Sequence, residues 1–248
     1  MKIAERAWKQ ARTTGLLAFA FFLGGLSRDW AAEPAEGIAL MIVYDTSGSM
    51  QQKVPDAGGR PTPKHVVARR ALTAVLDRLQ AVRSGPAETS PVIDAGMVVF
   101  EGDHAVIAVR CGTFDHQAFR DWLAHHTGFN RGTPLGDSVR LAGESVLKSK
   151  RPRKHVLVIT DGINTRGADP KVTLPEIQRE ADSKHAVVSF HFVAFDVNAA
   201  EFNAVKKLGA TVVAASDEKQ LDSQLRFIVE KKILLEDEEP ASTKPKSN

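Results

Sequence analysis

The sequence is short of cysteine and lacks the glycine motifs of several large enzyme families. Cys111 is the single cysteine among 248 residues, so no disulfide can form within the chain. Stability must therefore come from a buried core, and about 200 residues beyond the N-terminal segment suffice for one domain. The chain also lacks the G-x-x-x-x-G-K-[ST] phosphate loop, the G-x-G-x-x-G turn and the G-x-S-x-G nucleophile elbow. P-loop NTPases, dinucleotide-binding enzymes and α/β-hydrolases are thus disfavoured.

Hydrophobic runs long enough to cross a membrane are missing as well. Gly15–Leu26 is an apolar run of twelve residues, whereas a spanning helix needs roughly 20. Four basic residues precede it and Ala31-Ala32 follows it, which is the pattern of an export signal. We therefore predict that residues 1–32 are a signal peptide, either removed or retained as a short anchor. The protein is expected to be periplasmic or secreted, and no membrane span is expected in the mature form.

A concentrated positive charge is absent from the rest of the chain. The net charge of +3 belongs to residues 1–32, which carry five basic and two acidic residues and leave 28 of each elsewhere. The positive charge is therefore no evidence for nucleic-acid binding, which would need a concentrated basic patch, and we expect no nucleic-acid partner. Residues 236–248 are charged, contain Pro240 and Pro245 and show no apolar period, so we predict a disordered tail.

Apolar runs alternate with helical patterns between residues 37 and 235. The expected strands are Ile38–Tyr44, Asp94–Phe100, Ala105–Val109, His155–Thr160, Val187–Phe195 and Thr211–Ala214. The expected helices are Lys64–Leu79, Phe114–His125, Pro134–Leu147, Leu174–Lys184, Ala199–Leu208 and Lys219–Leu234. This alternation predicts an α/β fold, a doubly wound and mostly parallel sheet with helices on both faces. Glu101-Gly102-Asp103 reads as a tight turn, which predicts one antiparallel edge strand.

Residues with side-chain oxygens cluster at three places. Asp45-Thr46-Ser47-Gly48-Ser49 directly follows one apolar run, and Thr160-Asp161-Gly162 directly follows another. Gly132-Thr133-Pro134-Leu135-Gly136 lies between them in the sequence. Open α/β sheets place binding sites at the carboxyl ends of their strands. Ligands that are all oxygen suit a hard cation, Mg²⁺ first, with Mn²⁺ or Ca²⁺ as alternatives.

The three segments, in this order and strand context, resemble the metal-ion-dependent adhesion site of the von Willebrand factor type A family. The resemblance covers about residues 37–235 and implies a Rossmann-like fold of that family. It implies that the hydroxyls bind the metal directly and the carboxylates directly or through water. The metal ligands so implied are Asp45, Ser47, Ser49, Thr133 and Asp161. It also implies a binding module without catalytic residues, in which a Glu or Asp of a protein partner completes the coordination.

A bacterial exported branch of the family resembles the chain more closely. That branch tends to carry a glycine-rich insert after the serine motif, here Gln51–Pro63. It also tends to carry a sequence like Asp161-Gly162-Ile163-Asn164-Thr165, followed by Asp169-Pro170. A pair of cysteines often brackets the Gly-Asp-Pro step in that branch. This chain has Arg166 and Lys171 where they would fall, so no such disulfide is present.

Two other functions remain as alternatives. A Mg²⁺-dependent phosphoryl-transfer enzyme would also use an Asp at a strand end, but a haloacid-dehalogenase-like phosphatase would need a second Asp where Ser47 stands. No obvious general base accompanies the serines. A structural assembly subunit is the other alternative, in which the metal acts only as a staple and the closing helix and tail dock a neighbour.

Overall fold

The computed structural model describes residues 37–86, 90–129 and 131–235, and its main sheet has six strands. Those strands are β1 (Gly37–Tyr44), β4 (Val92–Glu101), β5 (His104–Thr113), β6 (Arg153–Thr160), β7 (Val188–Phe195) and β8 (Thr211–Ala215). Across the sheet the order is β5-β4-β1-β6-β7-β8. Only the edge pair β4–β5 is antiparallel; the other neighbouring strands pair in parallel. The predicted sheet is therefore confirmed, including its single antiparallel edge strand.

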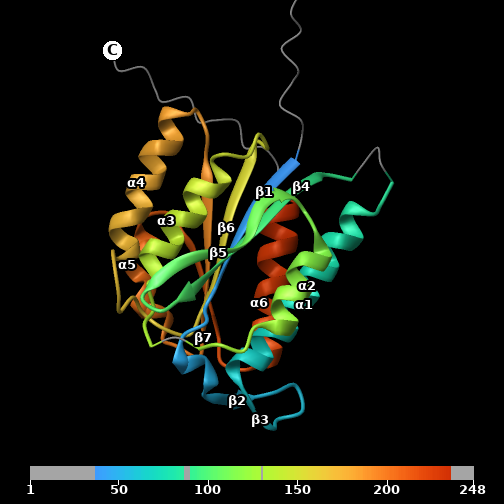
Figure 1. The fold of residues 1–248 in the computed structure, drawn as a ribbon, viewed down its shortest axis with the longest axis vertical. Helices are drawn as coiled ribbons and strands as arrows, with labels where there is room; N and C mark the ends of the chain where they lie inside the picture. The colour runs from blue at the N-terminus through green and yellow to red at the C-terminus, as the bar shows by residue number, and fades with distance from the viewer. Residues whose placement is uncertain (1–36, 87–89, 130, 236–248) are drawn as a thin grey trace, which may run out of the picture. The chain divides into compact units, whose positions relative to one another are not determined.

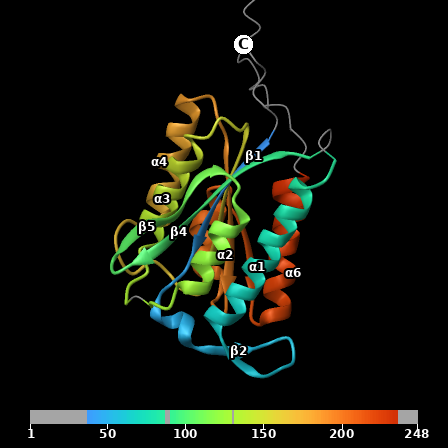
Figure 2. The same cartoon turned by 45° about the vertical axis from the view of Figure 1, so that its right-hand side comes forward.

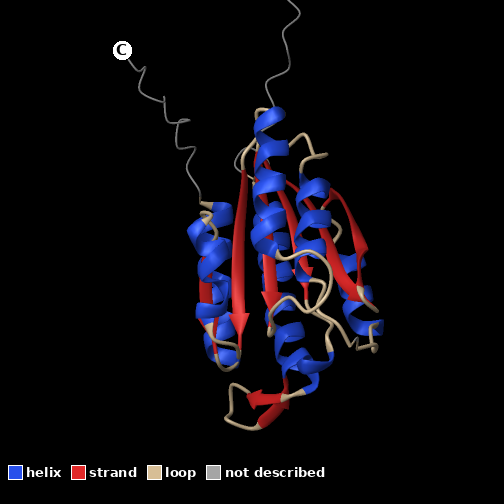
Figure 3. Cartoon of the chain, turned by 90° about the vertical axis from the view of Figure 1, so that its left-hand side faces the viewer, coloured by secondary structure: helices blue, strands red, loops and turns tan. Residues whose placement is uncertain are grey.

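Helices cover both faces of this sheet, as Figure 1 shows on either side of the strands. Figure 3 looks onto one face, where helices lie in front of the strands. One face carries α1 (Lys64–Arg83), α2 (His116–His125) and α6 (Glu218–Phe227), which continues as the π-helical segment η3 (Ile228–Leu234). The other face carries α3 (Leu135–Val146), α4 (Pro170–Ser183), the short turn η2 (Ala199–Phe202) and α5 (Asn203–Lys207). The architecture is the doubly wound α/β fold that the sequence predicts.

Strand β1 shows why the apolar runs are continuous. All eight of its residues are buried. Ile38, Leu40 and Ile42 belong to the core beneath α1 and α6, whereas Ala39 and Met41 belong to the core beneath α3 and α4. Because both faces are covered, apolar residues are favoured at every position of this strand. Each large side chain buried in this way stabilises the fold by about 1.5–3 kcal/mol.

Helix boundaries differ from the predicted ones where capping residues act. Helix α4 begins at Pro170, four residues before the predicted start, because the Asp169 carboxylate accepts a hydrogen bond from the backbone N–H of Lys171 at 2.9 Å. A proline in the first position and an aspartate before it are strong helix-start signals. Helix α1 also runs further than predicted, to Arg83.

The insert between the serine motif and α1 forms structure that the sequence analysis did not predict. The 3-10 turn η1 (Gly48–Gln51) leads from the serine motif into the insert, which forms a hairpin of β2 (Lys53–Pro55) and β3 (Pro61–Pro63). The Asp56 carboxylate holds the hairpin turn by accepting from the N–H groups of Gly58 and Arg60, each at 2.9 Å. Figure 2 shows the hairpin below α1 and α6, which lie side by side.

Both predicted terminal segments, residues 1–32 and 236–248, lie outside the described residues. Within the part of the chain that the structure describes, no helix combines the length and hydropathy of a membrane span.

Candidate metal centre

The register of the sheet brings the first and third polar segments together. Strands β1 and β6 are parallel neighbours in which Tyr44 pairs with Ile159. Asp45, the residue after β1, donates its backbone N–H to the Ile159 carbonyl at 3.0 Å. Both strands end at the same edge, so Asp45 and Asp161 extend from adjacent positions at the carboxyl end of the sheet.

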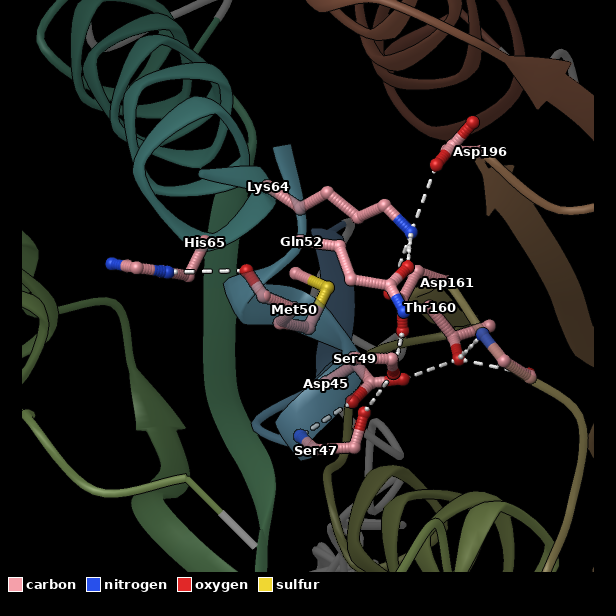
Figure 4. Close-up of polar contacts among 11 residues, drawn as sticks. Asp45, Ser47, Ser49, Met50, Gln52, Lys64, His65, Thr160, Asp161 and Asp196 are labelled. Atoms are coloured by element: carbon pink, nitrogen blue, oxygen red, sulfur yellow. Dashed lines mark hydrogen bonds and ion pairs between the residues drawn. The ribbon is translucent and has the colours of Figure 1, made fainter. Parts of the chain in front are cut away.

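Four of the five predicted ligands are linked by hydrogen bonds, as Figure 4 shows. The Asp45 Oδ1 atom accepts from the backbone N–H of Ser47 at 2.7 Å. The Ser47 and Ser49 hydroxyl oxygens lie 2.9 Å apart, and Ser49 Oγ donates to Asp161 Oδ1 at 2.7 Å. Segments separated by more than a hundred residues thus present one continuous row of oxygens.

The fifth residue, Thr133, comes from the loop before α3. Thr133 and Thr165 exchange two hydrogen bonds, from Thr133 N to Thr165 Oγ1 at 2.9 Å and from Thr165 N to Thr133 O at 3.0 Å. These bonds hold the loop against the segment that follows β6. The Thr133 hydroxyl faces Gly162, since a methyl group added at Gly162 would lie 3.7 Å from Thr133 Oγ1.

Burial governs the electrostatics of Asp45, whose exposed fraction is 0%. Removal from water raises the pKa of its carboxyl from 3.8 to about 6, and the nearby Asp161 carboxylate adds to the rise. Hydrogen bonds from Ser47 and Thr160 oppose it; the Thr160 hydroxyl donates to Asp45 Oδ2 at 2.6 Å. A charged Asp45 is therefore unfavourable in the metal-free protein, and a bound cation would relieve that cost.

Metal binding at this site should depend on pH. The Asp45 carboxyl has a pKa of about 6, so below pH 6 a proton competes with the cation and the affinity for Mg²⁺ should fall about tenfold per pH unit. Above pH 7 the carboxylate is ionised and the affinity should be constant. Titration calorimetry with Mg²⁺ at pH 5.0, 6.0, 7.0 and 8.0 measures this, and an affinity that stays level from pH 5 to pH 8 would contradict it.

The oxygen row fits a six-coordinate cation. Neighbouring ligands of an octahedral Mg²⁺ at roughly 2.0–2.1 Å lie about 2.9 Å apart. The Ser47–Ser49 and Ser49–Asp161 oxygen pairs are separated by 2.9 and 2.7 Å. A cation could therefore replace the shared protons with little movement of the side chains. Among the described residues no group of three or more His, Cys, Asp and Glu could hold a metal, so this candidate depends on hydroxyl ligands beside its two carboxylates.

Four residues that the sequence analysis did not assign to the site also contribute. Thr160, already noted, bonds Asp45. Lys64, the first residue of α1, places its ammonium 3.0 Å from Asp161 Oδ2, 2.9 Å from Asp196 Oδ2 and 3.1 Å from Gln52 Oε1. Burial acts to lower the pKa of Lys64, but the two aspartates together raise it above 10.5. No sequence motif marks Lys64. Among its partners outside the predicted ligands, only Asp196 has a sequence position, directly after a strand, that could have suggested a part in the site.

Comparison with known proteins identifies the fold family. The sequence profile of the von Willebrand factor type A domain matches residues 39–229, which include all five candidate ligands. A comparison with curated protein sequences finds no match.

Three solved structures illustrate the similarity of fold. The PilB minor pilin from Streptococcus sanguinis superposes with a TM-score of 0.61 at 14% identity, covering 79% of this chain and 61% of the pilin. Proximal thread matrix protein 1 of the mussel byssus, with a zinc-occupied MIDAS motif, gives 0.57 at 15% identity over 78% of this chain and 47% of that one. The vWF domain of the type V pili tip protein Mfa5 from Porphyromonas gingivalis gives 0.59 at 12% identity over 79% and 95%. The chain thus spans about three fifths of the pilin and half of the mussel protein.

Proposed function

Because the chain belongs to the von Willebrand factor type A domain family, we propose that it is a binding module that grips a protein partner through a divalent metal ion. Asp45, Ser47, Ser49, Thr133 and Asp161 would hold the ion, with Mg²⁺ favoured over Mn²⁺ and Ca²⁺. A Glu or Asp side chain of the partner would complete the coordination. The observation that carries this proposal is the row of oxygens from Asp45 to Asp161 at the carboxyl edge of the sheet.

The chemistry of the row supports carboxylate capture. Neutral hydroxyls leave the charge of a cation largely uncompensated, and the second carboxylate oxygens of Asp45 and Asp161 are already engaged by Thr160 and Lys64. When bound, the metal supplies an electrophilic coordination position that attracts an anionic oxygen. The protein residues fix where that position lies, because each is held by strand ends or by the Thr133–Thr165 hydrogen bonds.

The geometry disfavours the phosphoryl-transfer alternative. A nucleophilic Asp45 would have to reach a substrate, but its side chain is fully buried and both of its oxygens accept hydrogen bonds. Ser47 occupies the place of a second aspartate.

The similar structures of a minor pilin, a pilus tip domain and a thread matrix protein also accord with a binding role. We also propose that the protein is exported, on the basis of the signal pattern in residues 1–32, and that it belongs to a bacterial branch of the family, on the basis of the insert after the serine motif.

Binding of Mg²⁺ should stabilise the folded protein. A ligand that binds only the native state adds about 2.7 kcal/mol at a hundred times its dissociation constant. We therefore expect the melting temperature to rise between EDTA and 10 mM Mg²⁺, and Ser47→Ala to abolish the rise. Ser145→Ala is the matched control, because that hydroxyl donates to the Leu141 carbonyl at 2.6 Å inside α3 and away from the site. An equal rise in Ser47→Ala would argue against these ligands.

The partner can be sought with the same variants. Immobilised wild-type protein should retain a partner from an extract of its source in Mg²⁺ and release it in EDTA, and Asp45→Ala should retain none. Capture that survives both EDTA and Asp45→Ala would refute the metal-bridged mechanism. Steady phosphate release from a general phosphatase substrate, lost in Asp45→Ala, would instead favour the enzyme.

A further inference from the structure

Lys64 is a buried cation in direct contact with the candidate metal centre. Its exposed fraction is 2%, which is rare for lysine unless the charge is paired. The ammonium has three acceptors, Asp161, Asp196 and Gln52, for its three N–H donors. Its backbone N–H also donates to the Gln52 carbonyl at 2.8 Å. The charge is therefore fixed in place and fully hydrogen-bonded.

The contacts of Lys64 join three separate parts of the edge of the sheet. Gln52 follows the serine motif, Asp161 follows β6, and Asp196 follows β7. Figure 4 shows the lysine reaching from α1 across to all three. Asp196 has a positive φ of 54°, an uncommon backbone conformation for a residue other than glycine. Its carboxylate is 41% exposed, so of the two carboxylates that Lys64 contacts, only Asp161 is fully buried.

Asp161 is shared between the lysine and the oxygen row. Its Oδ1 atom accepts from Ser49, on the side where a cation would bind, while its Oδ2 atom accepts from Lys64. The ammonium thus partly neutralises one of the two carboxylates of the site. It also offsets the repulsion between Asp161 and Asp45, which would otherwise face each other across a site without a cation.

We propose that Lys64 is a built-in counter-ion that holds Asp161 in position without a metal and lowers the affinity of the site for a divalent cation. The inference rests on the proposed metal-binding function and adds one residue that sets the affinity of the site for the metal. A positive charge within several Å of a bound divalent cation repels it. The repulsion is substantial, because the effective dielectric constant near a protein site is about 20, well below that of water. The ion that does bind is less neutralised by Asp161 and so attracts a partner carboxylate more strongly.

Substitutions on the two sides of the ion pair should shift Mg²⁺ affinity in opposite directions. Lys64→Met removes the positive charge and should tighten the Mg²⁺ dissociation constant at least about tenfold. Asp196→Asn removes the negative charge that compensates the lysine and should weaken the binding of Mg²⁺. Lys154→Met is the matched control: Lys154 is also buried, with 7% exposed, but its ammonium bonds the Ser149 and Arg151 carbonyls near the start of β6. This control should leave the dissociation constant unchanged.

Calorimetric titration with Mg²⁺, together with urea unfolding in EDTA and in 10 mM Mg²⁺, distinguishes the outcomes. The counter-ion role predicts that Lys64→Met loses more stability in EDTA than in Mg²⁺. A purely structural ion pair would lose the same stability in both and keep the wild-type affinity, which would overturn the inference. Lys64→Gln provides the same comparison if Lys64→Met does not fold, and Asp196→Asn tests the opposite shift in affinity.

The two proposals fail in different ways. If the wild type binds Mg²⁺ and Lys64→Met binds it no more tightly, the counter-ion role is wrong and the proposed function stands. If only Lys64→Met binds Mg²⁺, the lysine blocks the site and the metal-bridged function is wrong for the natural chain. If neither binds, both proposals fall.

Discussion

Asp45→Asn should make the metal-free protein more stable at pH 7.5 by about 3 kcal/mol while eliminating its response to Mg²⁺. The carboxyl of Asp45 has a pKa raised from 3.8 to about 6, and a shift of about two units corresponds to about 3 kcal/mol. A raised pKa means that the contribution of Asp45 to stability is complete below pH 3.8 and is lost as the pH rises through 6. A neutral asparagine avoids that loss.

The replacement can keep the local hydrogen bonds. An asparagine oxygen can accept from Ser47 N as Asp45 Oδ1 does now. Its amide can donate to Thr160 Oγ1, whose hydroxyl then donates to the Gly162 carbonyl, already 3.1 Å away. Only the negative charge is lost, and with it a metal ligand. Binding sites commonly lower the stability of the unliganded protein, because the groups that bind the ligand are unfavourable without it.

Urea unfolding in EDTA at pH 4.0 and pH 7.5 tests this expectation. The advantage of Asp45→Asn should be present at pH 7.5 and almost absent at pH 4.0, where the wild-type carboxyl is largely protonated. A variant less stable than the wild type at pH 7.5 would show that the buried charge is compensated in the metal-free protein.

Gly136→Ala should destabilise the fold by about 3 kcal/mol and weaken Mg²⁺ binding. A Cβ atom at Gly136 would lie 2.0 Å from the Ala168 carbonyl oxygen, a backbone atom that cannot rotate away. The start of α3 would therefore have to separate from the loop after β6. Thr133 lies three residues earlier and bonds Thr165 in that loop, so its hydroxyl would move away from Gly162, which it now faces.

Gly143→Ala is the internal control for this prediction. Its Cβ would approach Ile177 side-chain atoms at 2.7 Å, and a side chain can adjust where a carbonyl cannot. Gly143 is seven residues further along α3 and far from the Thr133 loop in the sequence. We expect a smaller loss of stability, measured by urea unfolding, and an unchanged Mg²⁺ affinity. Equal losses of affinity in both variants would show that the Thr133 position does not depend on the Gly136 contact.

The sequence predicts the fold well because its signals are local. The run Ile38–Tyr44 is apolar without interruption, which only a strand covered on both faces requires, and all of it is buried. The Glu101-Gly102-Asp103 turn correctly predicts the antiparallel edge pair, with Gly102 at a positive φ of 63°. The hairpin within Gln51–Pro63 is not predicted, because its strands have three residues each and contain three prolines between them. Asp56 and its hydrogen bonds stabilise it instead.

The candidate site is predictable only in part. Asp45 and Asp161 follow apolar runs, so the sheet topology places them together, and the structure joins them through Ser47 and Ser49. Lys64 is different, because its part in the site depends on the angle at which α1 leaves the insert and on the exit of β7. A lysine at the start of a helix ordinarily points to solvent, and nothing in the sequence distinguishes this one.

Crystals grown with Mn²⁺ and acetate, with data collected for anomalous scattering from manganese, test the central claim most directly. We predict one strong anomalous peak within bonding distance of the Ser47 and Ser49 hydroxyl oxygens, with an acetate oxygen in the same coordination shell. The Thr133 hydroxyl should lie on the same ion, either directly or through water. An absence of manganese at these serines, in crystals where it binds elsewhere, would contradict the account.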